Sequence, residues 1–236
     1  MVAAWLRCGL SGKNMVNLAQ FKSEGFLLLP EFLDYDGLTR LEGSLNSDRF
    51  AQRNLLENSI VREFAASLQV RELMSTVLGD SSFAVRAILF DKTPAANWNL
   101  GWHQDCVVPV RERKDVEGFR GWSVKKGVLH VQAPAAIMER MAALRVHLDD
   151  CPESNGALQV LAGSHRNGVL TDAAVMDMDK SREVVCAVFK GGALVMHSLL
   201  LHASSPSASP AHRRILHIDF AATELPGGLE WHSRIS

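Results

Sequence analysis

Three stretches of this sequence alternate at every second residue between apolar and charged or polar side chains: residues 83–92, 143–149 and 213–220. This period of two is typical of β-strands, which point successive side chains to opposite sides of a sheet. One interpretation is a set of ordinary sheets that are wetted on one side. The other is a double-sheet barrel with helices on its outside and a polar cavity within.

Each of these stretches has an apolar face and an opposite, more polar face. The apolar faces comprise Phe83, Val85, Ala87 and Leu89, then Leu144, Val146 and Leu148, then Leu216, Ile218 and Phe220. The opposite faces comprise Arg86, Ile88, Phe90 and Lys92, then Arg145, His147 and Asp149, then Arg213, Ile215, His217 and Asp219. Because the N-terminal part is rich in helical patterns that need a surface to pack on, we favour the barrel.

The rest of the chain supplies those helices and some shorter strands. Apolar residues at three- and four-residue spacing predict helices over 15–24, 34–45 and 61–78. Ser59 is the expected N-cap of the third helix, and Gly79 is expected to end it. Short strands are predicted at 26–29, 157–161, 184–189 and 193–197. We therefore expect a flexible terminus (1–14), then one mainly β domain with flanking helices (15–236) whose helical part is 15–80.

The bulk properties exclude some classes of partner. Lys and Arg number 25 against 26 Asp and Glu, so no net charge points to a nucleic-acid partner. No apolar run reaches the roughly 18–20 residues of a membrane span. Four scattered cysteines without a Cys-X-X-Cys pair, and an N-terminus unlike a signal peptide, favour a cytoplasmic protein with reduced thiols. The sequence gives no basis for an oligomeric state.

The triplet His103-Gln104-Asp105 is the first candidate for chemistry. In an extended strand, residues two apart point to the same side, so this imidazole and carboxylate would converge. A second imidazole from later in the chain would complete a 2-His-1-carboxylate triad, which holds Fe(II) and leaves coordination positions open. His-X-Asp triplets are common without a metal, and both His197 and His202 are candidates for the third ligand on the residues alone.

Residues 107–141 form a long insert that is polar and irregular for most of its length. Such an insert is typical of a lid over a substrate site, although a solvated charged loop would have the same composition. The aromatic and polar residues in or beside it include Trp98, and the candidate substrate contacts are Trp102, Trp122, His130 and Gln132. Its excess of basic residues is compatible with an anionic small-molecule substrate, such as a carboxylate, a phosphate or a CoA thioester.

The order of several short motifs is more specific than any one of them. After His-X-Asp come Asn155-Gly156, Gly163-Ser164-His165, the Gly-led strand at 191–197, Leu200-Leu201-His202-Ala203-Ser204, and Arg213-Arg214. Together with the opening Phe21–Phe26, this series resembles the phytanoyl-CoA dioxygenase family from about residue 20 to 222. The resemblance implies an Fe(II)- and 2-oxoglutarate-dependent oxygenase on a double-stranded β-helix, a cupin-like jelly-roll core spanning 83–222.

The resemblance also implies roles for individual residues. It assigns His103, Asp105 and His202 to iron, because the family ligand follows the Leu-Leu pair, and leaves His197 to the cavity wall or core. Arg213 matches the arginine that binds the distal carboxylate of 2-oxoglutarate, as a bidentate guanidinium can. Further positions expected near the co-substrate are Ser204, Gln104, Ile88 and Lys92. Arg145 departs from the tryptophan of a relative and would add a second cation for 2-oxoglutarate or for an acidic substrate.

The implied reaction consumes 2-oxoglutarate and O2, releases succinate and CO2, and hydroxylates an unactivated C–H of a small molecule. Related halogenases have Ala or Gly in place of the carboxylate ligand, so Asp105 favours hydroxylation or desaturation. The family does not fix the substrate. Two alternatives from other classes are a non-catalytic jelly roll that binds a metal or ligand, and a Zn-dependent hydrolase with the same three ligands, which would not need Arg213.

Overall fold

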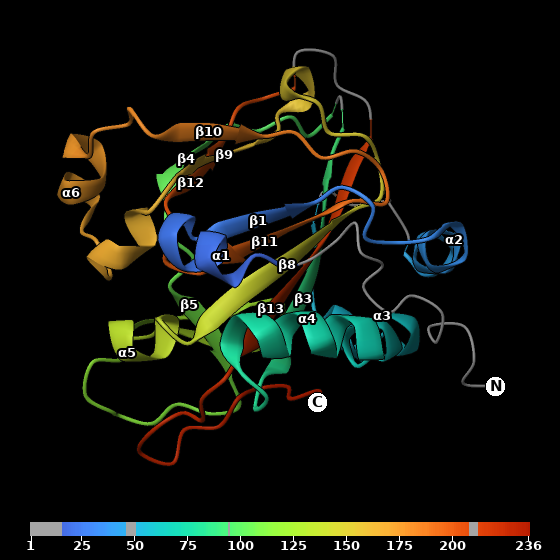
Figure 1. Cartoon of the computed structure of the whole chain (residues 1–236). Helices are drawn as coiled ribbons and strands as arrows, with labels where there is room; N and C mark the ends of the chain where they lie inside the picture. Colours follow the sequence, from blue (N-terminus) through green and yellow to red (C-terminus); the bar gives the residue numbers. More distant parts are fainter. Residues whose placement is uncertain (1–15, 46–50, 94, 208–211) are drawn as a thin grey trace.

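The structure is a computed structural model that describes residues 16–45, 51–93, 95–207 and 212–236 (Figure 1). The expected flexible terminus, 1–14, lies outside these residues. The helices are α1 Leu18–Glu24, α2 Tyr35–Ser44, α3 Ser59–Ala65, α4 Leu68–Leu78, α5 Ala135–Met138 and α6 Asp172–Asp177, with 3-10 turns at Leu55–Glu57, Glu153–Asn155 and Ser164–Asn167. The strands are β1 Phe26–Leu29, β2 Ala51–Gln52, β3 Phe83–Lys92, β4 Leu100–His103, β5 Val107–Val110, β6 Arg120–Lys125, β7 Val128–Gln132, β8 Met141–His147, β9 Leu158–Leu161, β10 Glu183–Cys186, β11 Ala193–His197, β12 His202–Ser204 and β13 Arg213–Ala221.

Two antiparallel sheets form the expected jelly roll. The larger has the strand order β1-β11-β8-β13-β3-β2, and the smaller has the order β10-β9-β12-β4. Figure 1 shows the smaller sheet lying as a separate layer above β1, β11 and β8. The predicted fold class, mainly β with flanking helices, is confirmed.

Five of the described α-helices, all except α5, begin at a side-chain cap. The Asp34 carboxylate accepts a hydrogen bond from the backbone N–H of Gly37 at 2.8 Å, which satisfies an otherwise unpaired donor at the start of α2. The single helix expected over 61–78 was wrong, because Ser67 interrupts it and caps α4 through the N–H of Val70. Asn58, rather than Ser59, caps α3.

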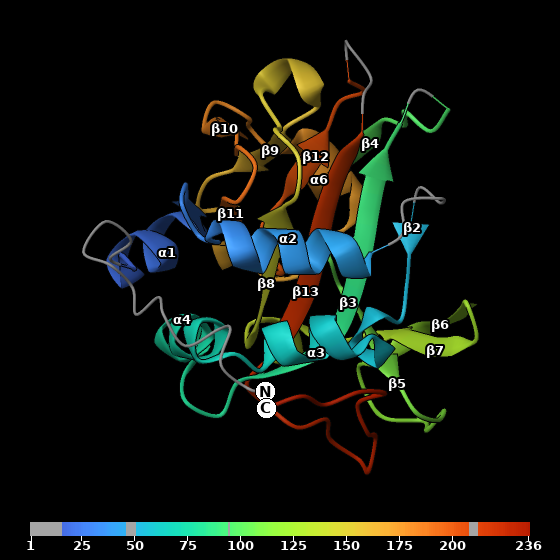
Figure 2. The ribbon, with the colours of Figure 1, turned by 90° about the vertical axis from the view of Figure 1, so that its right-hand side faces the viewer.

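The outer face of the larger sheet carries the main hydrophobic core. Figure 2 shows α2 and α3 crossing this face over β8, β13 and β3. Leu144 of β8 and Leu216 of β13 are fully buried there, together with Leu41 of α2 and Phe64 of α3. Alternate residues of β8 and β13 therefore point toward the helices, as the period of two predicts.

The alternation predicted for β3 holds for only part of the strand. Ala87 and Leu89 pack into the main core as expected, whereas Val85 belongs to a second hydrophobic cluster. The pairing with β13 shifts here: Asp219 pairs with Arg86, but Phe220 pairs with Ala84. Val85 is the extra residue of this β-bulge, and a bulge turns the side chains that precede it to the other face.

The insert 107–141 is not irregular, contrary to expectation. It folds into an antiparallel sheet of order β5-β7-β6, followed by α5. Val108 and Val131 bury apolar side chains in the second cluster, where Trp231 also packs. This separate core explains why so charged a segment is ordered; a role as a lid stays a prediction.

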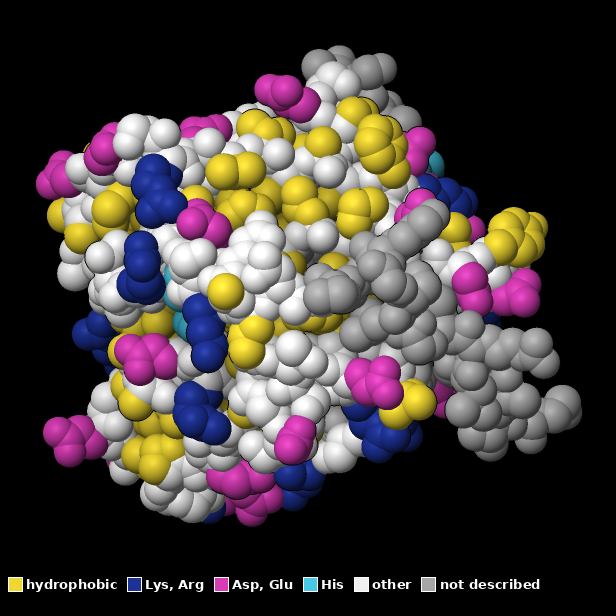
Figure 3. All heavy atoms as spheres, in the orientation of Figure 1, with side chains coloured by type: hydrophobic (Ala, Val, Ile, Leu, Met, Phe, Trp, Pro, Cys, Tyr) yellow, Lys and Arg dark blue, Asp and Glu magenta, His cyan; other side chains and the backbone are white. Residues whose placement is uncertain are grey.

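The surface shows no broad field of one charge on the face drawn in Figure 3. Basic and acidic side chains are interspersed there with apolar ones. No helix in the described part of the chain has the length and apolar character needed to cross a membrane. The described cysteines, Cys106, Cys151 and Cys186, are buried free thiols.

Candidate active site

A cavity of about 290 Å³ lies on the inner, polar side of the larger sheet. Its walls come from both sheets of the jelly roll, from β3, β8 and β13 on one side and β4, β9 and β12 on the other. The predicted site residues that line it are Ile88, His103, Gln104, Asp105, Arg145, His202, Ser204 and Arg213. The structure therefore gathers into one hollow groups that are more than 100 residues apart in the sequence.

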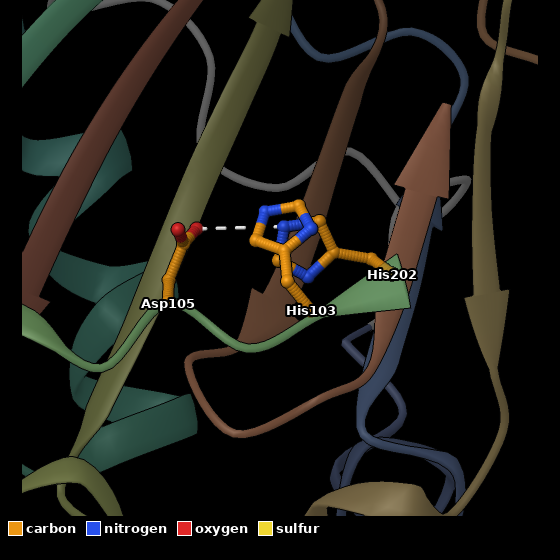
Figure 4. Close-up of side chains that lie close together, drawn as sticks. All are labelled: His103, Asp105 and His202. Carbon is orange, nitrogen blue, oxygen red and sulfur yellow. Dashed lines mark ion pairs between the residues drawn. The ribbon is translucent and has the colours of Figure 1, made fainter. Parts of the chain in front are cut away.

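His103, Asp105 and His202 converge at the side of this cavity (Figure 4). His103 ends β4 and His202 begins β12, and the two residues are partners in the pairing of these strands. One potential ligand atom from each of the three side chains lies within 4.8 Å of the others. His202 Nε2 is 3.6 Å from Asp105 Oδ2, and the two imidazole rings have centroids 4.1 Å apart.

Backbone contacts fix the ring orientation of both histidines. His103 Nδ1 lies 2.8 Å from the carbonyl of Gly101, and His202 Nδ1 lies 2.9 Å from that of Leu200. A carbonyl only accepts hydrogen bonds, so each Nδ1 carries the proton and each Nε2 keeps a free lone pair. This is the arrangement in which a neutral imidazole binds a metal through Nε2.

Electrostatics keep these groups in the forms that bind cations. Burial lowers the pKa of His202 to about 4, despite the opposing effect of Asp105, so the ring is neutral at pH 7. Burial alone would raise the pKa of Asp105, but His202 and His217 outweigh it and lower that pKa, which favours the carboxylate. Two imidazoles and one carboxylate are the donor set of a facial triad for a divalent transition metal, so the residues fit such an ion.

His197, the competing histidine, lies elsewhere. It ends β11, and its Nδ1 accepts a hydrogen bond from the N–H of Leu199 at 3.1 Å. Its ring is close to those of Phe21 and His165, whose centroids are 6.3 Å and 4.9 Å away. Thus His202, rather than His197, is beside His103 and Asp105.

A second polar group of the cavity surrounds Arg213, at the start of β13. Its guanidinium donates to the carbonyl of Gly156 through one terminal nitrogen, while its buried Nε has no hydrogen-bond partner among the described residues. Lys92, fully buried behind it, donates to Ser204 Oγ at 3.1 Å and to the Ser205 carbonyl at 2.7 Å. Burial, and then Arg213, lower the pKa of Lys92 to about 8.

Gly156 explains how the backbone comes so close to these cations. It adopts a φ of +64°, and a Cβ at this position would lie 2.5 Å from the Ser205 carbonyl oxygen and 3.3 Å from a terminal nitrogen of Arg213. A larger residue would therefore clash with the Ser205 carbonyl, which accepts from Lys92, and would shift the Gly156 backbone, whose own carbonyl accepts from Arg213. The Asn155-Gly156 motif thus has a direct role in shaping this end of the cavity.

A chain of polar contacts runs along the remaining wall. Arg145 is hydrogen-bonded to His217 Nδ1 at 2.9 Å, and His217 Nε2 lies 2.9 Å from Asp219 Oδ1. The other oxygen of Asp219 accepts from Arg86 Nε at 2.6 Å. Arg145, like Arg213, has a buried Nε without a partner among the described residues. The polar face predicted for the long strands contained all these residues, although His217, Asp219 and Arg86 had no predicted role.

Gln104 and Ile88 line the cavity in different ways. The Gln104 amide donates to the carbonyls of Gly168 and Leu199 at 2.8 and 2.7 Å, and it accepts from the N–H of Leu170 at 2.8 Å. Its polar atoms are thus engaged in tying two loops to the triad strand. Ile88 offers only an apolar surface.

The predicted substrate contacts lie outside the main cavity. Trp102 packs beside the small cluster of Leu161, Val175 and Leu201, while Trp122 borders the second core. His130 lines a narrow neighbouring cleft, and burial lowers its pKa to about 4. Gln132 lies on β7 near Gly121. The structure does not bring these side chains to the triad.

Other residues line the main cavity instead. Phe90, Trp98 and Leu100 form apolar or aromatic parts of the cavity lining, and Arg53 and Lys125 are charged parts of it. Phe90 stands on the predicted polar face of β3, so the alternation could have identified it. Arg53 gave no comparable signal, because it follows a two-residue strand that is recognisable only by its pairing with β3.

Similar solved structures share the fold of this chain. AviO1 from Streptomyces viridochromogenes Tue57 is 21% identical, with a TM-score of 0.60 over 89% of this chain and 94% of that chain. HygX from Streptomyces hygroscopicus, solved with nickel and 2-oxoglutarate bound, is 16% identical, with a TM-score of 0.65 over 89% and 88%. EctD from S. alaskensis, solved with bound Fe, is 18% identical, with a TM-score of 0.65 over 89% and 80%.

Sequence comparison identifies the family. No curated protein matches the chain. The family model for phytanoyl-CoA dioxygenase matches residues 21–215, which include the three convergent side chains and Arg213. Since this match spans most of the sequence, the chain belongs to the phytanoyl-CoA dioxygenase family.

Proposed function

We propose that this protein is an Fe(II)- and 2-oxoglutarate-dependent dioxygenase that hydroxylates an unactivated C–H bond of a small molecule. One observation carries the proposal: His103, Asp105 and His202 share a cavity with the guanidinium of Arg213. A metal hydrolase would need the three ligands but not a buried cation in the same hollow. The family, and the iron and 2-oxoglutarate in the solved structures of similar fold, support the same assignment.

His103, Asp105 and His202 would hold the iron. The carbonyls of Gly101 and Leu200 would keep both Nε2 atoms directed at it by accepting the Nδ1 protons. Iron with bound 2-oxoglutarate supplies O2 activation: 2-oxoglutarate and O2 become succinate and CO2, and the remaining oxygen atom enters the substrate C–H bond.

Arg213 would bind the distal carboxylate of 2-oxoglutarate. Its buried, unpaired Nε–H fits a carboxylate oxygen, because a buried donor without an acceptor is otherwise costly. Lys92 donates to Ser204 Oγ, which leaves the hydroxyl hydrogen of Ser204 free to donate to the same carboxylate. Ile88, Phe90 and Trp98 would restrict water around the reacting groups.

Succinate release without added substrate tests this proposal. In aerated buffer with Fe(II) and 2-oxoglutarate, the wild-type chain should form succinate slowly, because oxidative decarboxylation of 2-oxoglutarate precedes the attack on a substrate. His202→Ala and substitution of Zn(II) for Fe(II) should each stop it, while both proteins keep the wild-type circular dichroism spectrum. Equal succinate formation by wild type and His202→Ala, or turnover that requires Zn(II), would contradict the proposal.

A further inference from the structure

The cavity is lined by more cationic side chains than the binding of a metal ion and 2-oxoglutarate would require. Its cationic lining residues are Arg53, Arg86, Lys125, Arg145 and Arg213, whereas among the described residues Asp105 is the acidic one. Arg86 is paired with Asp219, Arg145 contacts His217, and Arg213 would bind 2-oxoglutarate.

Of the residues that the structure describes, Arg53 and Lys125 are the two cationic lining residues that have neither such a partner nor a role in binding 2-oxoglutarate. Both side chains are half-buried and line the cavity, and neither has a hydrogen bond or ion pair within the described parts of the chain. The direction of the Arg53 side chain follows from the pairing of β2 with β3. Ala51 and Gln52 pair with Phe90 and Leu89, so Arg53 falls opposite Ile88 and on the same face.

These two cations lie far from Arg213. Ile88, which Arg53 faces, pairs with His217, and His217 is four positions after Arg213 in β13. At roughly 3.3 Å per residue, the Cα atoms of His217 and Arg213 are about 13 Å apart along the strand, and β3 separates β2 from β13. Arg53 shares a narrow cleft with Arg86, and burial and then Arg86 lower the pKa of Arg53. A 2-oxoglutarate molecule held by Arg213 would therefore leave Arg53 and Lys125 uncovered.

We propose that Arg53 and Lys125 form a second anion subsite, which binds a carboxylate or phosphate group of the primary substrate. The inference rests on the proposed function and names its substrate class, a compact anionic small molecule. Two like charges side by side repel in the free protein, and an anion between them relieves that repulsion while accepting charge-assisted hydrogen bonds. Burial, and then Arg53 and Arg86, already lower the pKa of Lys125, in keeping with this repulsion.

Calorimetric titration of the anaerobic complex with Fe(II) and saturating 2-oxoglutarate tests the subsite. Hexanoate and hexyl phosphate are the anionic probes, and 1-hexanol is the neutral probe of equal chain length. We expect at least one anion to bind about tenfold tighter than 1-hexanol, since a charged hydrogen bond adds that much. The tighter of the two anions identifies the group, carboxylate or phosphate.

Variants locate the binding. Arg53→Gln and Lys125→Gln should each weaken the preferred anion about tenfold, without changing the binding of 1-hexanol. Matched controls are Arg120→Gln and Lys126→Gln, which remove exposed charges from the β6–β7 hairpin that carries Lys125. Each should change the affinity for the anion by less than about twofold. Equal losses in all four variants, or anion binding no tighter than that of 1-hexanol, would overturn the subsite. Failure of the Fe(II)–2-oxoglutarate complex to form would instead contradict the proposed function.

Discussion

The two faces of the larger sheet differ in what they bury. On the outer face, Leu144 of β8 and Leu216 of β13 pack with the helices in a dry apolar core. On the inner face, Arg145 and His217, which pair with one another across the same two strands, are just as inaccessible but polar. The same backbone therefore serves stability on one side and a site on the other, because strand side chains alternate.

The charged side chains of the inner face differ in how completely they are paired. Asp219 is 2% exposed and sits between Arg86 and His217, which compensates for the removal of its carboxylate from water. Arg145 and Arg213 are less fully satisfied, with their buried Nε atoms unpaired in the described structure. Unsatisfied donors at this depth are costly, so we interpret them as reserved for a bound anion.

Removing a triad ligand should have the largest effect on the inner face. His202→Ala should abolish Fe(II) binding, a greater loss than the roughly 10- to 100-fold that follows removal of a supporting hydrogen bond. Anaerobic calorimetry with Fe(II) measures it. The free energy of unfolding should change much less, and retention of wild-type Fe(II) affinity would show that this imidazole is not a ligand.

Asp219→Asn should destabilise the fold by about 4 kcal/mol, because it leaves the buried guanidinium of Arg86 without its counter-charge. Burial raises the pKa of Asp219, but Arg86 and His217 outweigh it and hold that pKa well below its usual value of about 4. The carboxylate therefore contributes stability above pH 4, and this contribution is lost as the pH falls below 4. Urea unfolding from pH 7 to pH 3 should show the gap between wild type and variant narrowing; a constant gap would contradict the electrostatic explanation.

Leu144→Ala tests the outer face. The side chain is fully buried in the main core, so its truncation should cost about 3 kcal/mol in the free energy of unfolding. Urea denaturation measures this loss. Because the residue points away from the cavity, the Fe(II) affinity of the folded variant should stay at the wild-type value. A parallel loss of Fe(II) affinity would show that the two faces are not independent.

His197→Ala should have the smallest effect on the site. Its ring packs with Phe21 and His165, away from the triad. Calorimetry should give an Fe(II) affinity within about twofold of wild type, since no ligand or supporting hydrogen bond is removed. A loss like that of His202→Ala would mean that the wrong histidine has been identified.

The sequence predicted what depends on local periodicity. The convergence of His103 and Asp105 follows from their spacing, and the polar faces of β8 and β13 follow from alternation. The choice between His197 and His202 needed the family resemblance, because spacing permits both. In the structure, the pairing of β12 with β4 places His202 beside His103. Features that rest on distant pairings, such as the bulge at Val85, had no local signal.

The sequence also failed to predict the strands of the insert 107–141, for a different reason. Its strands were missed because β6 lies largely at the surface, with Val124 68% exposed, so the chain shows no regular apolar period there. The core beneath it depends on Trp231, about 100 residues later in the sequence. No short window of sequence contains both halves of that core.

The proposed function requires that one cavity binds both a metal ion, through His103, Asp105 and His202, and 2-oxoglutarate. Anaerobic addition of 2-oxoglutarate to the Fe(II)-loaded protein, followed by visible absorption, tests this most directly. We expect a weak charge-transfer band in the wild type, and we expect Arg213→Gln to need at least about tenfold more 2-oxoglutarate to reach the same band. Absence of the band in the Fe(II)-loaded wild type, or an unchanged titration for Arg213→Gln, would contradict it.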